Sequence, residues 1–230
     1  MRRLATLAVA ALLLSGCAPA APTQTSLTTE LAERLAVTRF RNFDAGVRAI
    51  DVTVPGTGSG EVELTGWFDY AASVGYGSVT ADGQPAGLLW WSADTIAVRE
   101  GEFAEPLPAP TDGWVSSGLD ASSTALATAV TIVLSLGSDR PENPQLLQQS
   151  DAAFEKSSTV DGVSVDVVLG PSSDDVSAAS VASAHRARYW LDETGLMLRF
   201  EVTLGNSATP MTIDFGNGAG IAIPQEVPGT

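Results

Sequence analysis

The stretch ARYWLDETGLMLRFEVTL, residues 187–204, contains two runs in which apolar and polar residues alternate, separated by Glu193, Thr194 and Gly195. The second run places one set of apolar residues on a single face: Leu196, Leu198, Phe200, Val202 and Leu204. A period of two indicates a strand with one buried and one solvated face. Two such runs around a short loop with glycine predict a β-hairpin.

The same period recurs along most of the chain. Further runs lie at 50–54, 61–70, 74–81, 86–91, 95–100 and 211–215. Asp161-Gly162 separates two more alternating runs and is a strong signal for a two-residue hairpin turn. About ten strands with one wet face predict an α+β domain with one large curved antiparallel sheet, whose apolar face must be covered by helices.

Two or three helices are expected. Residues 27–45 have helical periodicity and Gly46 is a plausible stop, while Asn143-Pro144 can begin a short helix. Residues 122–137 contain no charged residue, and their only stripe of hydroxyls is Thr124, Thr128, Thr131 and Ser135. A helix that is apolar almost all round is either a core helix inside the curl of the sheet or the wall of a lipid-sized cavity.

The start of the chain predicts export. Met1, Arg2 and Arg3 precede an apolar run at 4–14, which is far shorter than the roughly 20 residues that cross a bilayer. The run ends in LSGC, residues 14–17, which resembles the lipobox of bacterial lipoproteins. This resemblance implies a lipoprotein signal peptide over 1–16, and a palmitate-bearing diacylglyceryl cysteine at Cys17. The alternative is an ordinary secretory signal with an incidental cysteine.

Removal of residues 1–16 leaves about 214 residues, enough for a single domain after a Pro- and Thr-rich tether over 17–26. Cys17 is the only cysteine, so no intramolecular disulfide can form. The 27 acidic residues against 12 basic residues argue against a nucleic-acid partner, which would require clustered Lys or Arg. We therefore expect attachment to the extracytoplasmic face of the cell membrane through the lipid on Cys17 alone.

No catalytic constellation, metal site or cofactor motif is evident, and we expect a protein that is not an enzyme. The one histidine, His185, has no nucleophile motif beside it, and Glu61 with Glu63 is better interpreted as a solvated acidic face than as an acid–base or calcium pair. Five tryptophans could stack on sugars, but structural use in the core is commoner. Trp90 and Trp91 must point to opposite faces of their strand.

The chain as a whole resembles the actinobacterial lipoproteins of the LprG/LppX type, and more broadly the LolA/LolB-like fold. The resemblance rests on LSGC, a tethered N-terminal helix, a long series of antiparallel strands interrupted by helices, and strand sequences such as ASVGYGSV and GLLWWSADTIAV. It implies a half-open barrel with helices on its concave face, a LolA-like lipid-binding domain over 27–215 and an irregular C-terminal tail over 216–230.

The resemblance also implies a function. The protein would bind a lipid or acylated glycolipid in an apolar cavity and carry or present it in the cell envelope, with a possible protein partner in transfer. The alternative is an interaction or sensor module that binds a partner protein without lipid cargo. The alternation in the strands and the helical spacing in residues 122–137 indicate which side chains face inward. From them we predict that the cavity is lined by Val62, Leu64, Phe68, Leu126, Val130, Val133, Leu198, Phe200 and Val202.

Overall fold

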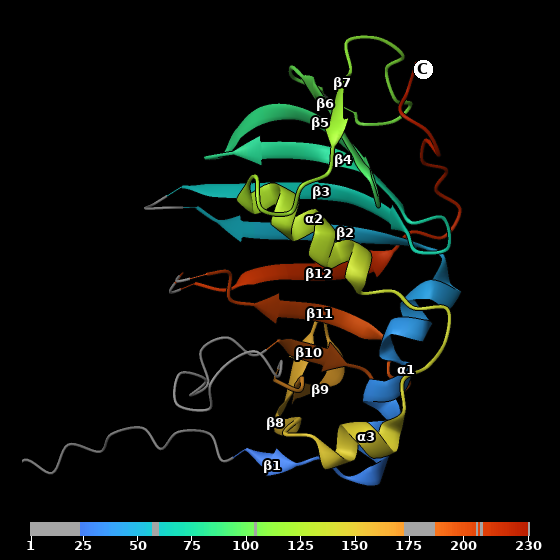
Figure 1. Cartoon of the computed structure of the whole chain (residues 1–230), viewed down its shortest axis with the longest axis vertical. Coiled ribbons are helices and arrows are strands. Elements are labelled where there is room, and N and C mark those ends of the chain that lie inside the picture. Colours follow the sequence, from blue (N-terminus) through green and yellow to red (C-terminus); the bar gives the residue numbers. More distant parts are fainter. Residues whose placement is uncertain are drawn as a thin grey trace, which may run out of the picture.

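The computed structural model describes residues 24–56, 60–103, 105–172, 187–205, 207 and 209–229. Its centre is one antiparallel sheet of 12 strands in the order β1-β8-β9-β10-β11-β12-β2-β3-β4-β5-β6-β7 (Figure 1). The strands are β1 (Thr25–Ser26), β2 (Val47–Pro55), β3 (Glu61–Asp69), β4 (Val74–Ala81), β5 (Gln84–Ser92), β6 (Thr95–Glu100), β7 (Val115–Gly118), β8 (Ala153–Val160), β9 (Val163–Leu169), β10 (Arg188–Leu191), β11 (Met197–Val202) and β12 (Met211–Asn217). The sheet is open, with β1 and β7 as its two edges.

Three helices accompany the sheet in the described part of the chain, and a side chain before the first turn caps each of them. Thr28 caps α1 (Thr29–Ala45), which ends at Gly46 with φ of 66°. Thr124 caps α2 (Ala125–Ser135), and Asn143 caps α3 (Pro144–Gln149), which has proline in its first turn. The cap side chains accept hydrogen bonds from backbone N–H groups that lack a partner within the helix. The predicted start of α3 is confirmed.

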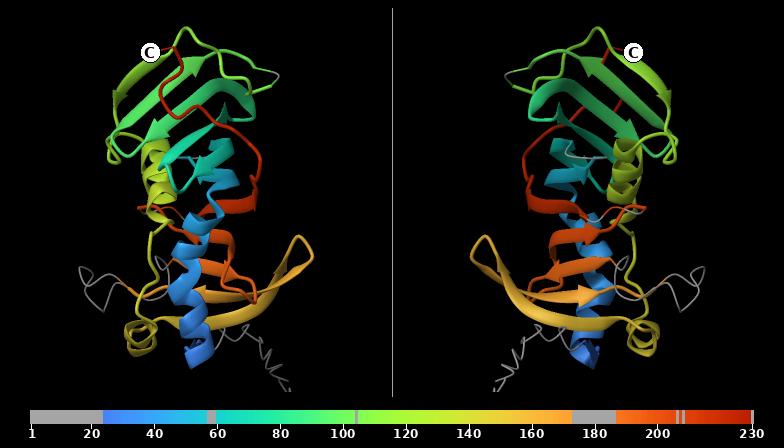
Figure 2. Two further views of the ribbon diagram at one scale, coloured as in Figure 1. Left: turned by 90° about the vertical axis from the view of Figure 1, so that its right-hand side faces the viewer. Right: turned by 90° about the vertical axis from the view of Figure 1, so that its left-hand side faces the viewer.

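The sheet has two differently covered faces. All three helices pack on its concave face, where their buried residues join the inward side chains of β2, β3, β5, β11 and β12 in the main core cluster. On the other face a second cluster forms around Tyr76 and Trp90, covered by the loop after β6 and by the C-terminal segment with Ile223. α2 and the C-terminal segment therefore lie on opposite sides of the sheet (Figure 2). The expected curved antiparallel sheet with helices on its concave face is confirmed.

The hairpin turn predicted at Asp161-Gly162 is confirmed, and a second turn of the same kind joins β4 to β5. Asp161 and Gly162, between β8 and β9, have φ of 49° and 81°, and Asp82 and Gly83, between β4 and β5, have φ of 53° and 72°. Positive φ at both central residues gives a turn whose twist matches that of the paired strands. Glycine tolerates this conformation because it has no Cβ, which is why these dipeptides mark the turns.

Two strands beyond the expected ten lie at the edges of the sheet. β1 occupies the last two residues of the segment predicted as tether, where Thr25 pairs with Phe154 and Ser26 with Ala153. β7 follows the loop after β6 and pairs with β6. Both are short and show no buried alternation, since all of their residues are exposed. After β12, residues 218–229 contain no helix or strand.

Candidate functional site

The residues predicted to line a cavity gather on the concave face, with one exception. Leu64, Phe68, Val130, Val133 and Phe200 belong to the main core cluster, and Val62, Leu126 and Val202 pack against it half-buried. They come from β3, α2 and β11, which are far apart in the sequence. The alternation in the strands and the helical spacing in α2 therefore identify the inward-facing residues correctly, apart from Leu198.

Leu198 packs in a different cluster, with Val160, Val165, Val167 and Trp190 on the other face of the sheet. The cause is a bulge between β10 and β11: Trp190 pairs with Arg199, but Leu191 pairs with Met197, so that Leu198 is an extra residue. A bulge of this kind shifts the alternation by one position. Met197, which is fully buried, takes the inward place expected for Leu198.

Four of the predicted lining residues touch protein on all sides in this structure. Leu64, Val130 and Val133 are 0% exposed and Phe68 is 1% exposed. A side chain that borders an open cavity retains surface that a water-sized sphere can reach, so the space beside these four is filled by other side chains. Val62, Leu126 and Val202 remain half-buried. That the eight residues on the concave face line a ligand cavity stays a prediction, and it requires a form in which α2 lies further from the sheet.

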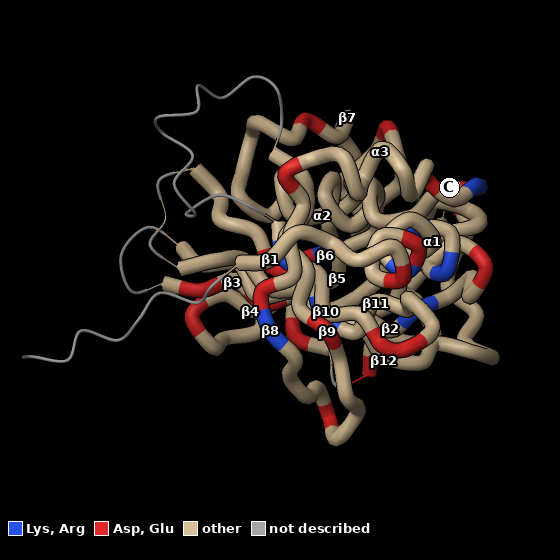
Figure 3. The backbone as a smooth tube through the Cα atoms, turned by 90° about the horizontal axis from the view of Figure 1, so that it is seen from below, with Lys and Arg blue, Asp and Glu red and all other residues tan. Residues whose placement is uncertain are grey.

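α2 is the element most directly placed to cover such a site. It contains no charged residue (Figure 3), and it lies across the concave side over β2 and β12 (Figure 1). Its buried face consists of small residues, Ala127, Ala129, Val130 and Val133. Leu126, Ile132 and Leu134 are only partly covered and pack against the edge of the core. The helix is thus apolar on both its buried and its half-buried sides.

The hydroxyl stripe of α2 does not form a polar binding surface. Thr124 caps the helix, Thr128 Oγ1 donates to Ala121 O at 2.6 Å and Thr131 Oγ1 donates to Ala127 O at 2.8 Å. Ser135 Oγ donates to Ile132 O at 2.7 Å. Because each hydroxyl bonds to the backbone of its own segment, the stripe adds no free polar group to the concave face.

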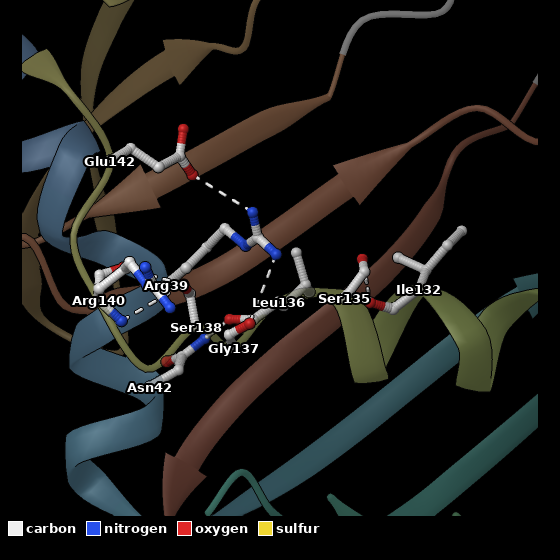
Figure 4. Close-up of polar contacts among 9 residues, drawn as sticks. All are labelled: Arg39, Asn42, Ile132, Ser135, Leu136, Gly137, Ser138, Arg140 and Glu142. Carbon is white, nitrogen blue, oxygen red and sulfur yellow. Dashed lines mark hydrogen bonds and ion pairs between the residues drawn. The ribbon is translucent and has the colours of Figure 1, made fainter. Parts of the chain in front are cut away.

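The C-terminal end of α2 is held by α1. Asn42 Nδ2 donates to Leu136 O at 3.0 Å and Arg39 donates to Gly137 O at 3.4 Å (Figure 4). The N–H of Ser138 donates to Arg39 O at 3.1 Å, and Arg39 also contacts Glu142 at 3.5 Å. These bonds satisfy carbonyl groups that the end of a helix leaves open. α2 is therefore fixed by polar bonds at one end and by apolar packing along its length.

A buried arginine extends this connection into the sheet. Arg48, 4% exposed, donates through Nη1 to Asn42 Oδ1 at 2.8 Å, through Nε to Gly216 O at 3.0 Å and through Nη2 to Met197 O at 3.1 Å. Its guanidinium also lies 5.2 Å from the ring centre of Phe215. All three acceptors are neutral, and burial lowers the pKa of Arg48 from its ordinary value.

Two further concave-face residues were not identified as site residues from the sequence. The Tyr70 hydroxyl and the Trp91 indole N–H are buried, and neither has a hydrogen-bond partner among the described residues. Both rings pack on Phe68, with ring centres 4.6 Å and 5.8 Å away. Burial raises the pKa of Tyr70 well above its ordinary value, so the hydroxyl stays protonated and can donate. The prediction that Trp90 and Trp91 face opposite sides of the sheet is confirmed, but the sequence indicates neither which of them faces inward nor that a partner is missing.

Other residues considered from the sequence lie away from the concave face or outside the described part of the chain. Cys17 and His185 lie outside the described residues. Glu63 accepts a hydrogen bond from Thr80 at 2.9 Å on an exposed strand face. Within the described ranges, no three His, Cys, Asp or Glu side chains are grouped closely enough to hold a metal ion. In the same part of the chain, every helix is too short or too polar to cross a bilayer.

No protein-family model and no curated protein sequence matches this chain. Among solved structures it is similar to the crystal structure of the Mycobacterium tuberculosis lipoprotein LppX, with 15% identity, a TM-score of 0.48 and coverage of 86% of this chain and 98% of that chain. It is also similar to an uncharacterised conserved protein from Thermus thermophilus, with 10% identity, a TM-score of 0.40 and coverage of 82% of this chain and 85% of that chain.

The sequence resembles lipoproteins of the LprG/LppX type, and LppX is among the similar solved structures. Identities and TM-scores this low carry no function from one protein to another. What the protein does has to be derived from the concave face and α2.

Proposed function

We propose that this protein is a membrane-anchored lipoprotein that binds a lipid or acylated glycolipid between α2 and the concave face of the sheet. It carries or presents this lipid in the cell envelope and catalyses no reaction. The anchor is the lipid on Cys17, and the cargo enters from the side where Leu126, Val62 and Val202 are only half-buried. The observation that carries the proposal is an uncharged helix with two apolar sides lying across an apolar sheet face.

The composition of α2 lowers the free energy needed to move it away from the sheet. The residues it buries are alanines and valines, so moving it exposes less apolar area than moving a helix rich in Leu and Phe. A lipid chain that enters the gap covers this area again, which offsets the cost of opening. The polar bonds from Asn42 and Arg39 to the C-terminal end of α2 keep that end in place while the rest moves.

A partner-protein function has one observation in its favour. β7 is an edge strand whose four residues are all exposed, and Val115 is 69% exposed. An exposed strand edge can accept a strand from another chain through backbone hydrogen bonds. This edge would serve either an interaction module without cargo or a carrier that docks on a partner during lipid transfer.

Native mass spectrometry of the full chain tests the proposal. The protein is expressed with its own leader in a lipoprotein-processing bacterium, extracted in mild detergent and released from the micelle in the gas phase. We expect one non-covalent lipid per chain in addition to the covalent anchor. A spectrum that shows only the covalently modified chain, with no uptake from added lipid, would favour the partner-protein function.

A further inference from the structure

Neighbouring aromatic residues differ in a consistent way between the two faces of the sheet. On the outer face, Trp90 Nε1 donates to Pro224 O at 3.0 Å and the Tyr76 hydroxyl donates to Pro106 O at 2.5 Å. On the concave face, the corresponding groups of Trp91 and Tyr70 have no partner among the described residues. Most buried polar groups in folded proteins are hydrogen-bonded, so two such donors on one face require an explanation.

The rings of the two unpartnered donors pack on the same residue of the concave face, Phe68. Strand register aligns Arg48 with Phe68, Phe68 with Gly75 and Gly75 with Trp91, which forms a row across four strands. A Cβ at Gly75 would overlap the indole ring of Trp91, so glycine lets this ring lie flat against the sheet beside Phe68. Tyr70, two residues after Phe68, reaches the same place from the end of β3.

The turn that follows α2 packs closely on Tyr70. A Cβ at Gly137, just after the helix, would overlap the ring of Tyr70, so glycine permits the close approach of this turn. Arg48 lies in the same row, and its guanidinium has five N–H donors, of which three are used in its described hydrogen bonds. Tyr70 and the residues of this row thus hold spare donors, and none of them is a carboxylate.

We propose that Tyr70 and Trp91 donate hydrogen bonds to the ester carbonyl oxygens of an acylated lipid bound beneath α2. This inference rests on the proposed function and specifies its ligand: the cargo is ester-linked, and its carbonyl groups lie beside Phe68 with the acyl chains along the apolar sheet. An unmade bond costs the empty protein the desolvation of both donors. The ligand recovers this free energy, so the closed empty form is destabilised relative to the loaded form.

The chemistry of the site favours a carbonyl over a phosphate or carboxylate. Tyr70 and Trp91 are neutral donors, and Arg48, the cation in the same row as Trp91, is already bonded to three oxygen atoms. Burying an anion in this apolar surrounding would require more compensating charge than one shared guanidinium gives. A neutral acceptor that brings its own apolar chains meets both requirements.

The test compares two probes that differ only in their carbonyl groups, dipalmitoylglycerol and its ether analogue dihexadecylglycerol. Each is offered to the full chain in vesicles of ether-linked phosphatidylcholine, and bound probe is measured by native mass spectrometry. The wild type should bind the ester about tenfold more tightly than the ether, as expected for one or two hydrogen bonds. Tyr70→Phe and Trp91→Phe should each reduce this preference severalfold and leave ether binding unchanged.

Matched variants on the outer face separate ligand binding from structural effects. Tyr76→Phe and Trp90→Phe each remove a satisfied donor, so they should lower the melting temperature and leave the ester preference intact. Tyr70→Phe removes an unsatisfied donor and should melt no lower than the wild type. A lower melting temperature for Tyr70→Phe, or an unchanged ester preference in both inner variants, overturns the carbonyl site while lipid binding stands. Failure of the wild type to bind either probe overturns both the carbonyl site and the proposed lipid-binding function.

Discussion

Arg48 and Asn42 are joined by a hydrogen bond of 2.8 Å between Nη1 and Oδ1, and Asn42 in turn donates to Leu136 O at 3.0 Å. Asn42 is 0% exposed, so this short chain of bonds passes through the core. It connects the start of strand β2 with the end of α2. Whatever moves α2 away from the sheet must either keep this connection as its pivot or break it.

Replacement of Asn42 by leucine should be strongly destabilising. It leaves a buried N–H of Arg48 and the carbonyl of Leu136 without partners, and the loss of one partner from a buried charged group costs about 3 kcal/mol or more. Chemical denaturation of Asn42→Leu should show this decrease in the free energy of unfolding. The exposed Gln148→Leu, which removes a surface bond to Thr29, should change it by less than about 0.5 kcal/mol. Similar values for the two variants would contradict a structural role for the Arg48–Asn42 connection.

Tryptophan substitutions should distinguish the filled part of the concave face from its half-buried edge. Val130 is 0% exposed, so Val130→Trp should cost on the order of 1–3 kcal/mol through overpacking beneath α2. Val202 is half-buried, and Val202→Trp should leave stability nearly unchanged while it reduces lipid uptake. The control Val98→Trp, at a position 42% exposed on β6, should affect neither. Normal lipid uptake by Val202→Trp would show that lipid does not enter on this side.

Cys17→Ala tests the anchor. The LSGC motif predicts that the thiol of Cys17 carries the diacylglyceryl group, so this substitution should abolish incorporation of labelled palmitate into the protein. Ser15→Ala keeps the cysteine with a small residue before it and should retain the label. Palmitate incorporation that persists in Cys17→Ala would contradict lipidation at this residue.

Glu201 predicts a pH dependence of stability. It is half-buried on β11, and burial raises its pKa from the ordinary value of 4.5 in spite of the nearby Arg188. A carboxyl whose pKa is higher in the folded state destabilises the fold as pH rises through that pKa, and has no such effect well below 4.5. Glu201→Gln should therefore raise the free energy of unfolding at neutral pH and leave it unchanged in acid. A variant that is less stable than the wild type at neutral pH would contradict the raised pKa.

The elements that follow from local chemistry could be predicted. Strand β6 matches the alternating run 95–100, α3 begins at the predicted Asn143-Pro144, and the Asp161-Gly162 turn has the required positive φ values. Each depends on residues that are close together in the chain. The edge strands β1 and β7 leave no alternation to detect, because all of their residues are exposed.

The prediction that Leu198 faces inward is wrong for a different reason. A bulge depends on how two strands pair and not on the composition of either. The bonds of Arg48 likewise join residues as far apart in sequence as Arg48 and Gly216, so the sequence identifies neither partner. The same holds for Tyr70 and Trp91: alternation places Trp90 and Trp91 on opposite faces, but which of them faces inward, and the absence of a hydrogen-bond partner for Tyr70 and Trp91 among the described residues, emerge only from the packed core.

Photo-crosslinking is the most direct test of lipid binding beneath α2. The full chain is loaded with an ester-linked lipid that carries a photoreactive group in its acyl chain, irradiated, digested and mapped by mass spectrometry. We expect labels on α2 and on the inward residues of β3 and β11, including Leu126, Phe68 and Val202, with little on the outer cluster around Trp90. Labels confined to the outer face or to the β7 edge, or no labelling at all, would contradict it.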